Sequence, residues 1–329
     1  MVSDSKYQCT LSFQSILEAN LCHLTAVGCI AFSKTGDYMA TGSCNSVDIY
    51  DTTTFAKVAS LREDSESKLG SEVRTIGFSP DGQRLAISKR ASDISIWDLS
   101  EQVIMERLSG SGASSLEFSP CGNLLAFGTR LQGAKLWNII DKSRTVDLPV
   151  PEISDSVLSI TFSPDGKLLA AGTNRADVLL WNVADGSPVK QFMGHKSWVA
   201  SVAFSPNGRH LVSGCDDGMR LWNLDVQVNT TNATPSSSLS ASEETSIVPW
   251  TREALSTSVW VKETRSRVIS LCDQGSVVSV CWSQDGKWII SGDDAGRIQF
   301  YDEAYKVLFV LFAHSEPGTF GSSLTDGSV

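Results

Sequence analysis

The stretch Trp198-Val-Ala-Ser-Val-Ala-Phe-Ser-Pro-Asn-Gly-Arg-His-Leu-Val-Ser-Gly-Cys-Asp-Asp-Gly-Met-Arg-Leu-Trp-Asn223 decides the fold of this chain. Its apolar residues alternate up to a Phe-Ser pair, a Pro-x-Gly turn follows, and two further alternating runs end in Gly and in Trp-Asn. Alternation with a period of two predicts half-buried β-strands. Pro, Asn and Gly are the residues that tight turns need. The stretch therefore predicts three short antiparallel strands.

The same unit occurs six times, each time with an aromatic-Ser pair before the turn and an aromatic residue followed by Asp or Asn at the end. The six copies span residues 27–51, 73–98, 113–138, 157–182, 198–223 and 277–302. Further strands are predicted after them at 57–61, 103–108, 145–148, 189–192, 268–271 and 306–312. The copies recur about every 40–45 residues, except before the last one. Since a four-stranded unit cannot bury both of its faces alone, the chain is predicted to be all-β, with six four-stranded blades packed radially as a β-propeller.

The predicted propeller covers residues 27–314. Residues 1–26 form an N-terminal segment with one edge strand at 10–17, and residues 315–329 a disordered tail. Residues 225–265 lengthen the fifth repeat, and their Ser- and Thr-rich first half predicts a partly disordered insertion. Two closures stay open, a six-bladed ring and an incomplete seven-bladed ring. The first is preferred, because a gap would expose apolar blade faces.

Composition narrows the classes of partner. The net charge is −10, and an acidic chain is poorly suited to general nucleic-acid binding. None of the eight cysteines lies in a C-x-x-C pair, so we expect reduced thiols in an intracellular protein and no metal site. No apolar run reaches the length of about 18 residues that a membrane helix needs. We expect no cofactor, no nucleic-acid or membrane partner and no small-molecule substrate.

The repeats resemble the WD-repeat β-propeller superfamily over residues 7–314. The first repeat has a short second turn and ends in Tyr50, a charged linker follows at 62–70, and the fifth repeat runs into an Asn-, Ser- and Thr-rich insertion. These features resemble the Groucho-like propeller of the fungal Tup-type general transcriptional corepressors. That resemblance implies a non-enzymatic scaffold that binds extended segments of transcription factors or chromatin proteins, in the nucleus rather than the cytoplasm. The alternative is a WD-repeat adaptor of a ubiquitin-ligase or signalling complex. An enzyme is disfavoured, because no catalytic constellation is found.

The fifth repeat alone is preceded by a Gly-His pair, Gly194-His195. In WD repeats the matching His joins a buried network with an Asp of the second turn, a Ser of the second strand and the Trp. The resemblance therefore implies a structural network of His195, Ser213, Trp222 and either Asp217 or Asp216. It does not imply a catalytic triad, because Ser213 would lie in a buried strand without an oxyanion site.

Charged residues occupy the second turn of several repeats, which in WD propellers shares a face with the loops leading into the first strands. Basic residues fall in repeats two to four and acidic residues in repeats five and six. Trp198 precedes the first strand of the fifth repeat, where no other repeat has an aromatic residue, and such a residue can anchor a partner. The predicted partner-binding rim is Trp198, Lys89, Arg90, Arg130, Arg175, Asp216, Asp293 and Asp294. The alternatives are that exposed turns simply collect charge and that Trp198 packs on its neighbouring blade.

Overall fold

The computed structural model describes residues 28–43, 46–62, 72–90, 93–108, 112–130, 132–140, 145–151, 155–224, 262–263, 267–269, 276–302, 304 and 306–312. The predicted N-terminal strand at 10–17, the predicted tail and most of the insertion at 225–265 lie outside these residues. Within the described part of the chain, no helix has the length and apolar character needed to cross a membrane.

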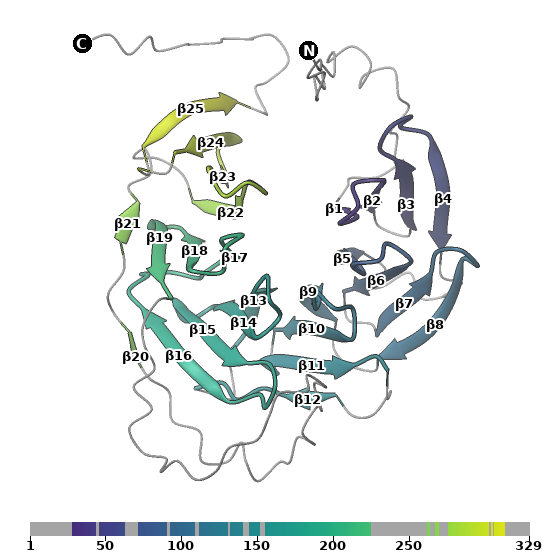
Figure 1. The fold of residues 1–329 in the computed structure, drawn as a ribbon, viewed down its shortest axis with the longest axis horizontal. Helices are drawn as coiled ribbons and strands as arrows, with labels where there is room; N and C mark the ends of the chain where they lie inside the picture. The colour runs from purple at the N-terminus through teal and green to yellow at the C-terminus, as the bar shows by residue number, and fades with distance from the viewer. Residues whose placement is uncertain are drawn as a thin grey trace, which may run out of the picture. The chain divides into compact units, whose positions relative to one another are not determined.

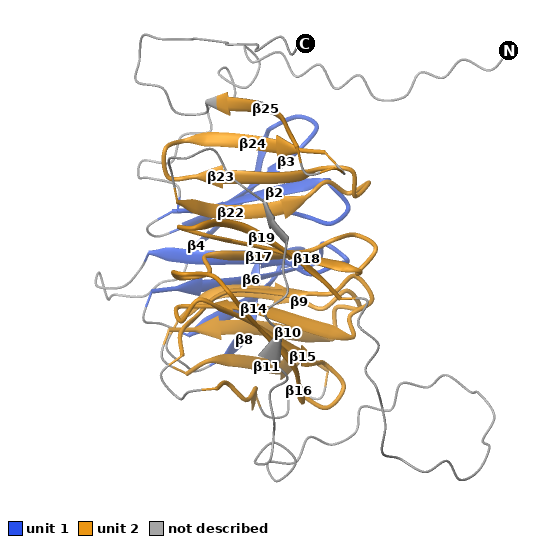
Figure 2. Cartoon of the chain, turned by 90° about the vertical axis from the view of Figure 1, so that its left-hand side faces the viewer, with its two compact units in different colours: residues 1–110 blue, residues 111–329 orange. Residues whose placement is uncertain are grey.

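The chain divides into two compact units, residues 1–110 and 111–329, which Figure 2 shows in blue and orange. The first unit holds two antiparallel sheets whose strands follow one another in chain order. Blade one is β1 (Cys29–Phe32), β2 (Tyr38–Gly42), β3 (Ser46–Asp51) and β4 (Lys57–Arg62). Blade two is β5 (Val73–Phe78), β6 (Arg84–Lys89), β7 (Ile94–Asp98) and β8 (Val103–Leu108).

The second unit holds four sheets among the described residues. Blade three is β9 (Ala113–Phe118), β10 (Leu124–Thr129), β11 (Ala134–Asn138) and β12 (Val146–Asp147). Blade four is β13 (Val157–Phe162), β14 (Leu168–Thr173), β15 (Asp177–Asn182) and β16 (Pro188–Met193). Blade five is β17 (Ser201–Phe204), β18 (His210–Cys215), β19 (Gly218–Asn223) and β21 (Arg267–Ile269). Blade six is β22 (Val277–Trp282), β23 (Ile289–Asp293), β24 (Arg297–Tyr301) and β25 (Val307–Phe312).

The Ser of each aromatic-Ser pair organises the turn between the first two strands. In blade five, Gly208 N donates to Ser205 O at 2.8 Å, and Ser205 Oγ accepts a hydrogen bond from His210 N at 2.9 Å. Gly208 has a φ of +69°, a conformation that favours glycine. The same pair of bonds recurs in every blade, made by Ser33, Ser79, Ser119, Ser163, Ser205 and Ser283. The repeated Ser is therefore a turn residue.

Neighbouring blades of a unit pack through apolar side chains. In the first unit, Ala40 and Ile49 of blade one share a core with Ile76 and Leu85 of blade two. In the second unit three such cores join blades three to six in succession. Figure 1 shows the innermost strands of that unit, β9, β13, β17 and β22, following one another. The six predicted four-stranded blades are confirmed within the described residues, and ring closure stays a prediction.

One strand of the insertion was not predicted. β20 (Lys262–Glu263) pairs in parallel with β16, as a fifth strand at the outer edge of blade four, before the chain continues to β21 in blade five. A two-residue strand carries too little alternation to be recognised in a sequence. Its pairing covers part of an edge that otherwise presents unpaired backbone groups.

Candidate functional site

The second turns and the loops leading into the first strands lie against one another. In blade four Asn174 N donates to Ser156 O at 3.0 Å, and Ser156 N donates to the Asn174 side chain at 2.9 Å. In blade six Asp294 makes the same two contacts with Ser276. These loops and turns therefore form one face of blades four to six, which we call the loop face.

A buried hydrogen-bonded network lies beneath the loop face in blade five. His195 Nδ1 is 2.8 Å from Asp217 Oδ1, and His195 Nε2 is 2.7 Å from Ser213 Oγ. Trp222 Nε1 donates to the same hydroxyl at 2.8 Å. The structure thus brings together the four residues of the predicted network and selects Asp217 over Asp216 as its acid.

The burial of His195 affects the protonation of this network. The imidazole of His195 is fully shielded from solvent, and this desolvation lowers its pKa, although its contacts with Asp217 act in the opposite direction. Burial tends to raise the pKa of Asp217. Hydrogen bonds from Cys215 and His195, together with nearby Arg220, outweigh that effect and hold the pKa below its ordinary value. The network therefore contains an imidazole whose lowered pKa favours the neutral form, beside a carboxylate, with the side chains of His195, Ser213 and Trp222 buried.

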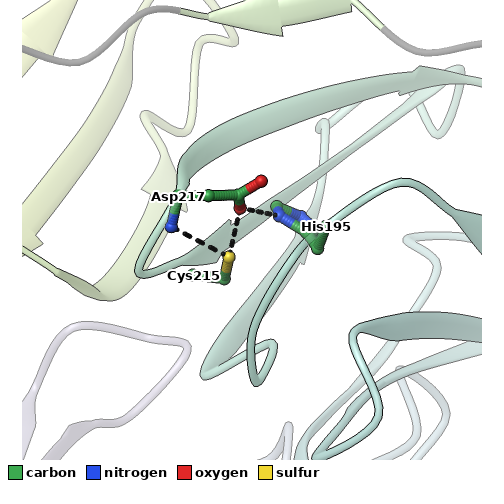
Figure 3. Close-up of side chains that lie close together, drawn as sticks. All are labelled: His195, Cys215 and Asp217. Atoms are coloured by element: carbon green, nitrogen blue, oxygen red, sulfur yellow. Dashed lines mark hydrogen bonds and ion pairs between the residues drawn. The ribbon is translucent and has the colours of Figure 1, made fainter.

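Cys215 is a member of the network that sequence reasoning missed. Its thiol donates to Asp217 Oδ1, and Asp217 N lies 3.2 Å from its sulfur (Figure 3). Ligand atoms of His195, Cys215 and Asp217 lie within 4.8 Å of one another, so the three side chains could approach a metal ion together. Burial, helped by the carboxylate, raises the pKa of the thiol to about 11, which opposes the thiolate form that metals bind. Mutual hydrogen bonds account for the closeness of the three side chains.

Trp198 lies in the loop between His195 and the first strand of blade five and is 64% exposed. The residues on both sides of it are held by hydrogen bonds. Ser197 Oγ donates to Asp216 Oδ2 at 2.6 Å, and Val199, which is fully buried, donates its N–H to Thr173 O of blade four at 2.9 Å. A large apolar side chain thus projects from a fixed loop.

Asp216 acts as a bridge between blades five and six. One carboxylate oxygen accepts from Ser197 and the other from Ser276, which leads into blade six. These two hydrogen bonds lower the pKa of Asp216 and keep it ionised. The residue is exposed as predicted, but its hydrogen-bonding capacity is used largely within the chain.

The basic residues of the predicted rim differ in their environments. Arg175 is paired with Asp155, whose side chain is 2% exposed, at 2.6 Å. Arg130 is exposed, and Ser156 Oγ donates to its carbonyl. In the first unit, exposed Arg90 lies 3.6 Å from Glu72. Lys89 is only 7% exposed at the end of β6, so its prediction as a rim residue is wrong. The second strand extends to Lys89 and takes it into the blade.

The acidic residues of blade six are also engaged within the chain. Asp293 accepts from Arg297 Nε at 2.6 Å, and its side chain is only 8% exposed. Asp294 is exposed and accepts from Ser276 N at 2.8 Å. The ion pairs of Arg175 and Asp293 neutralise part of the charge on which the predicted basic and acidic sectors depend.

Serines that precede the first strands were also overlooked. Ser156 and Ser276 occupy the same repeat position, and each donates to the second turn of the preceding blade, at Arg130 and Asp216 respectively. Both serines directly precede the first valine of their repeat, Val157 and Val277. This repeated Ser-Val pair could have indicated the contact. Asp155 gave no such signal, because no other repeat has an acid at its position.

Comparison with known proteins agrees with this architecture. The family model "WD domain, G-beta repeat" matches residues 13–51, 186–223 and 265–302. The model "Anaphase-promoting complex subunit 4 WD40 domain" matches residues 116–197.

Three curated proteins show local similarity. COMPASS component SWD1 of Saccharomyces cerevisiae is 40% identical over 77 residues, 22% of this chain and 17% of that protein. General transcriptional corepressor tupA of Dictyostelium discoideum is 33% identical over 91 residues, 28% of this chain and 16% of that protein. Nuclear distribution protein nudF 2 of Talaromyces marneffei is 42% identical over 43 residues, 13% of this chain and 10% of that protein.

Each match spans less than a fifth of the relative's length. The similarity is therefore to the repeat, and through it to proteins that include a corepressor and a COMPASS component. The chain carries WD40 repeats, the repeat of protein-interaction scaffolds, folded as the four-stranded antiparallel blades of a WD-repeat β-propeller.

Proposed function

We propose that the chain is a non-enzymatic scaffold of the corepressor type, which binds an extended segment of a transcription factor or chromatin protein on its loop face. The observation that carries the proposal is the exposure of Trp198 on a loop in which the residues on both sides of it are held by hydrogen bonds. Tryptophan is enriched among the residues that dominate binding energy. An anchor that is fixed before binding loses less conformational freedom when the partner arrives.

The surroundings of Trp198 agree with this role. Arg130 is exposed, its carbonyl accepts from Ser156 of the loop face, and Arg175 is partly exposed. Their positive charge would orient an acidic part of the partner and speed its association. The similarity to tupA and to SWD1 supports a partner from the transcription machinery. We therefore also propose a nuclear location.

The test is affinity purification of the full chain from cells, comparing the wild type with Trp198→Ala. The control is Ile140→Ala, which removes another exposed apolar side chain, at the opposite end of β11 from Arg130. We expect transcription or chromatin proteins to be recovered with the wild type and the control. Their recovery should fall sharply with Trp198→Ala, since loss of such an anchor typically costs about 2 kcal/mol or more, or about 30-fold in affinity.

Equal recovery with both variants would show that the loop face does not bind the partner. Cullin or kinase partners lost with Trp198→Ala would favour the alternative, an adaptor of a ubiquitin-ligase or signalling complex. Arg130→Glu is the cleaner test of charge. Arg175→Glu would place a second acid beside buried Asp155 and disturb the face itself.

A further inference from the structure

The position directly before the first valine of a repeat makes the same backbone contact in blades four and six. It is occupied by Ser156 in blade four and by Ser276 in blade six. The N–H of each serine donates to a side chain in the second turn of its own blade, Asn174 at 2.9 Å and Asp294 at 2.8 Å. In these two blades, the side chain in the second turn therefore holds the loop of the same blade.

Blade five departs from this pattern. Trp198 stands directly before Val199, at the position of the two serines. Asp216 holds the same turn position as the two side chains that accept from the serines, two residues after the glycine of the second strand. Its carboxylate accepts hydrogen bonds from two hydroxyl groups, Ser197 Oγ at 2.6 Å and Ser276 Oγ. The acid of blade five therefore connects its own loop to the loop of the next blade.

Ser197, Asp216 and Ser276 together form what we call the Asp216 clamp. One hydroxyl of the clamp belongs to the residue immediately before Trp198, and the other belongs to the residue at which the chain enters blade six. Hydrogen bonds to an ionised carboxylate are stronger than those between neutral groups. The clamp therefore joins the loop that carries Trp198 to a segment that lies far from it in the sequence.

The loop is held differently on the other side of Trp198. Val199 is fully buried, and its N–H donates to Thr173 O of blade four at 2.9 Å. A Cβ atom on Gly172 would lie 2.6 Å from Val199 O, so the valine fits closely against blade four. A buried backbone contact of this kind opens less readily than hydrogen bonds between side chains at a turn. The clamp is therefore the side of the loop that can be released.

We propose that Asp216 is a positioning residue of the partner site, and that Ser276 regulates this site by holding Asp216 in place. Displacement of the chain at Ser276 then releases the loop and weakens binding at Trp198. The inference rests on the proposed function, because it assigns regulation to the same face. The contacts that carry it all lie within the second unit.

Amide hydrogen exchange of the full chain tests the clamp without any partner. The reporters are the amides of Val199 and Ala200, which follow Trp198 and donate to Thr173 O and Gly214 O. With Ser276→Ala we expect both amides to exchange about fivefold faster, as expected when one hydrogen bond that restrains the loop is lost.

The matched control is Ser156→Ala. It removes a hydroxyl at the same repeat position, but this hydroxyl donates to Arg130 O and not to Asp216. We expect the exchange of the two reporter amides to stay as in the wild type. Ser276→Thr keeps the hydroxyl and should restore slow exchange. Thermal unfolding of each variant checks that its fold is retained.

Affinity purification from cells tests the consequence for binding. Recovery of the partner proteins should fall about fivefold with Ser276→Ala, less than with Trp198→Ala, and should be normal with Ser156→Ala and Ser276→Thr. A positioning role predicts that faster exchange and lower recovery occur in the same variants.

Equal exchange in Ser276→Ala and Ser156→Ala would overturn the clamp, whatever Trp198 binds. Faster exchange with undiminished recovery, in a chain that loses its partners with Trp198→Ala, would overturn the regulation of binding. Faster exchange with recovery that Trp198→Ala does not reduce would overturn the proposed function and the role of the clamp in binding, while supporting the contact itself.

Discussion

Blades five and one each bury an aromatic side chain at the same repeat position. The two blades differ in whether the polar atom of that side chain makes a hydrogen bond. Trp222 of blade five is fully buried, and its indole N–H donates to Ser213 within the His195 network. Tyr50 of blade one is 2% exposed, and its buried hydroxyl has no hydrogen-bond partner among the described residues. Both blades therefore place a large ring at this position. The hydrogen bond to the polar atom of the ring differs from blade to blade.

Three other blades support this interpretation. Trp97 Nε1 of blade two donates to Ser95 Oγ at 3.2 Å, and Trp181 Nε1 of blade four donates to Pro149 O at 2.8 Å. In blade six the Tyr301 hydroxyl donates to Gln299 Oε1 at 2.6 Å. Among the described residues, only blade five combines the ring with a buried histidine and an acid. We therefore expect blade five to depend most strongly on specific hydrogen bonds and blade one to depend mainly on packing.

The largest effect is expected from Trp222→Ala. Loss of a fully buried indole leaves a cavity and removes the donor to Ser213, so the free energy of unfolding should fall by about 3–5 kcal/mol. Urea denaturation followed by circular dichroism measures it. Trp198→Ala is the matched control, and because Trp198 is 64% exposed, a change within about 0.5 kcal/mol is expected. Similar losses for the two variants would contradict the assignment of Trp222 as core and Trp198 as surface.

A smaller loss, about 2–3 kcal/mol, is expected from His195→Ala, which leaves Ser213 and Asp217 without a shared partner. The effect should depend on pH. The pKa of His195 is lowered from 6.5 by burial, so the folded state disfavours the protonated form. The stability that neutral His195 provides is complete above about pH 6.5 and is lost as the pH falls toward its folded pKa.

Urea midpoints at pH 7.5 and 5.5 test this dependence. The wild type should lose more stability over this interval than His195→Ala does, because the variant lacks the group that must take up a proton. An equal decrease in the two proteins would place the pH sensitivity elsewhere in the chain.

Tyr301→Phe should lower the free energy of unfolding by about 1 kcal/mol, because it leaves buried Gln299 without its donor. Thermal denaturation of the full chain is sufficient to detect it. A neutral result would show that Gln299 finds another partner.

Tyr50→Phe should have the smallest effect and the opposite sign. Removal of a buried hydroxyl that makes no hydrogen bond should leave stability unchanged or raise it by up to about 1 kcal/mol. Measured beside Tyr301→Phe, this variant isolates the hydrogen bond from the ring. A loss as large as that of Tyr301→Phe would mean that the Tyr50 hydroxyl is satisfied after all.

Much of the blade architecture could be predicted because its signals are local. Alternation, the aromatic-Ser pair and the turn glycine lie within one repeat, and the observed strands and turns follow them closely. The network of His195, Ser213, Asp217 and Trp222 was also foreseen, through its resemblance to known WD repeats. Cys215 and β20 were missed, because a single thiol and a two-residue strand form no repeating pattern.

The candidate site depended more on contacts between blades. Asp216 and Ser276 meet although sixty positions separate them, and Arg175 is paired with an acid that leads into its own blade. Lys89 reads as a turn residue in sequence but is buried at the end of β6. At Lys89, charge in a turn therefore did not translate into charge available to a partner.

The sequence by itself determined the all-β fold, the number of repeats and the positions of their turns, because strand periodicity and turn chemistry are properties of neighbouring residues. Only the tertiary structure decided that Trp198 is exposed on a fixed loop and that Asp216 joins two blades. Those properties depend on which blade packs against which surface. Packing brings together residues that share no local pattern, so its outcome appears only in the folded chain.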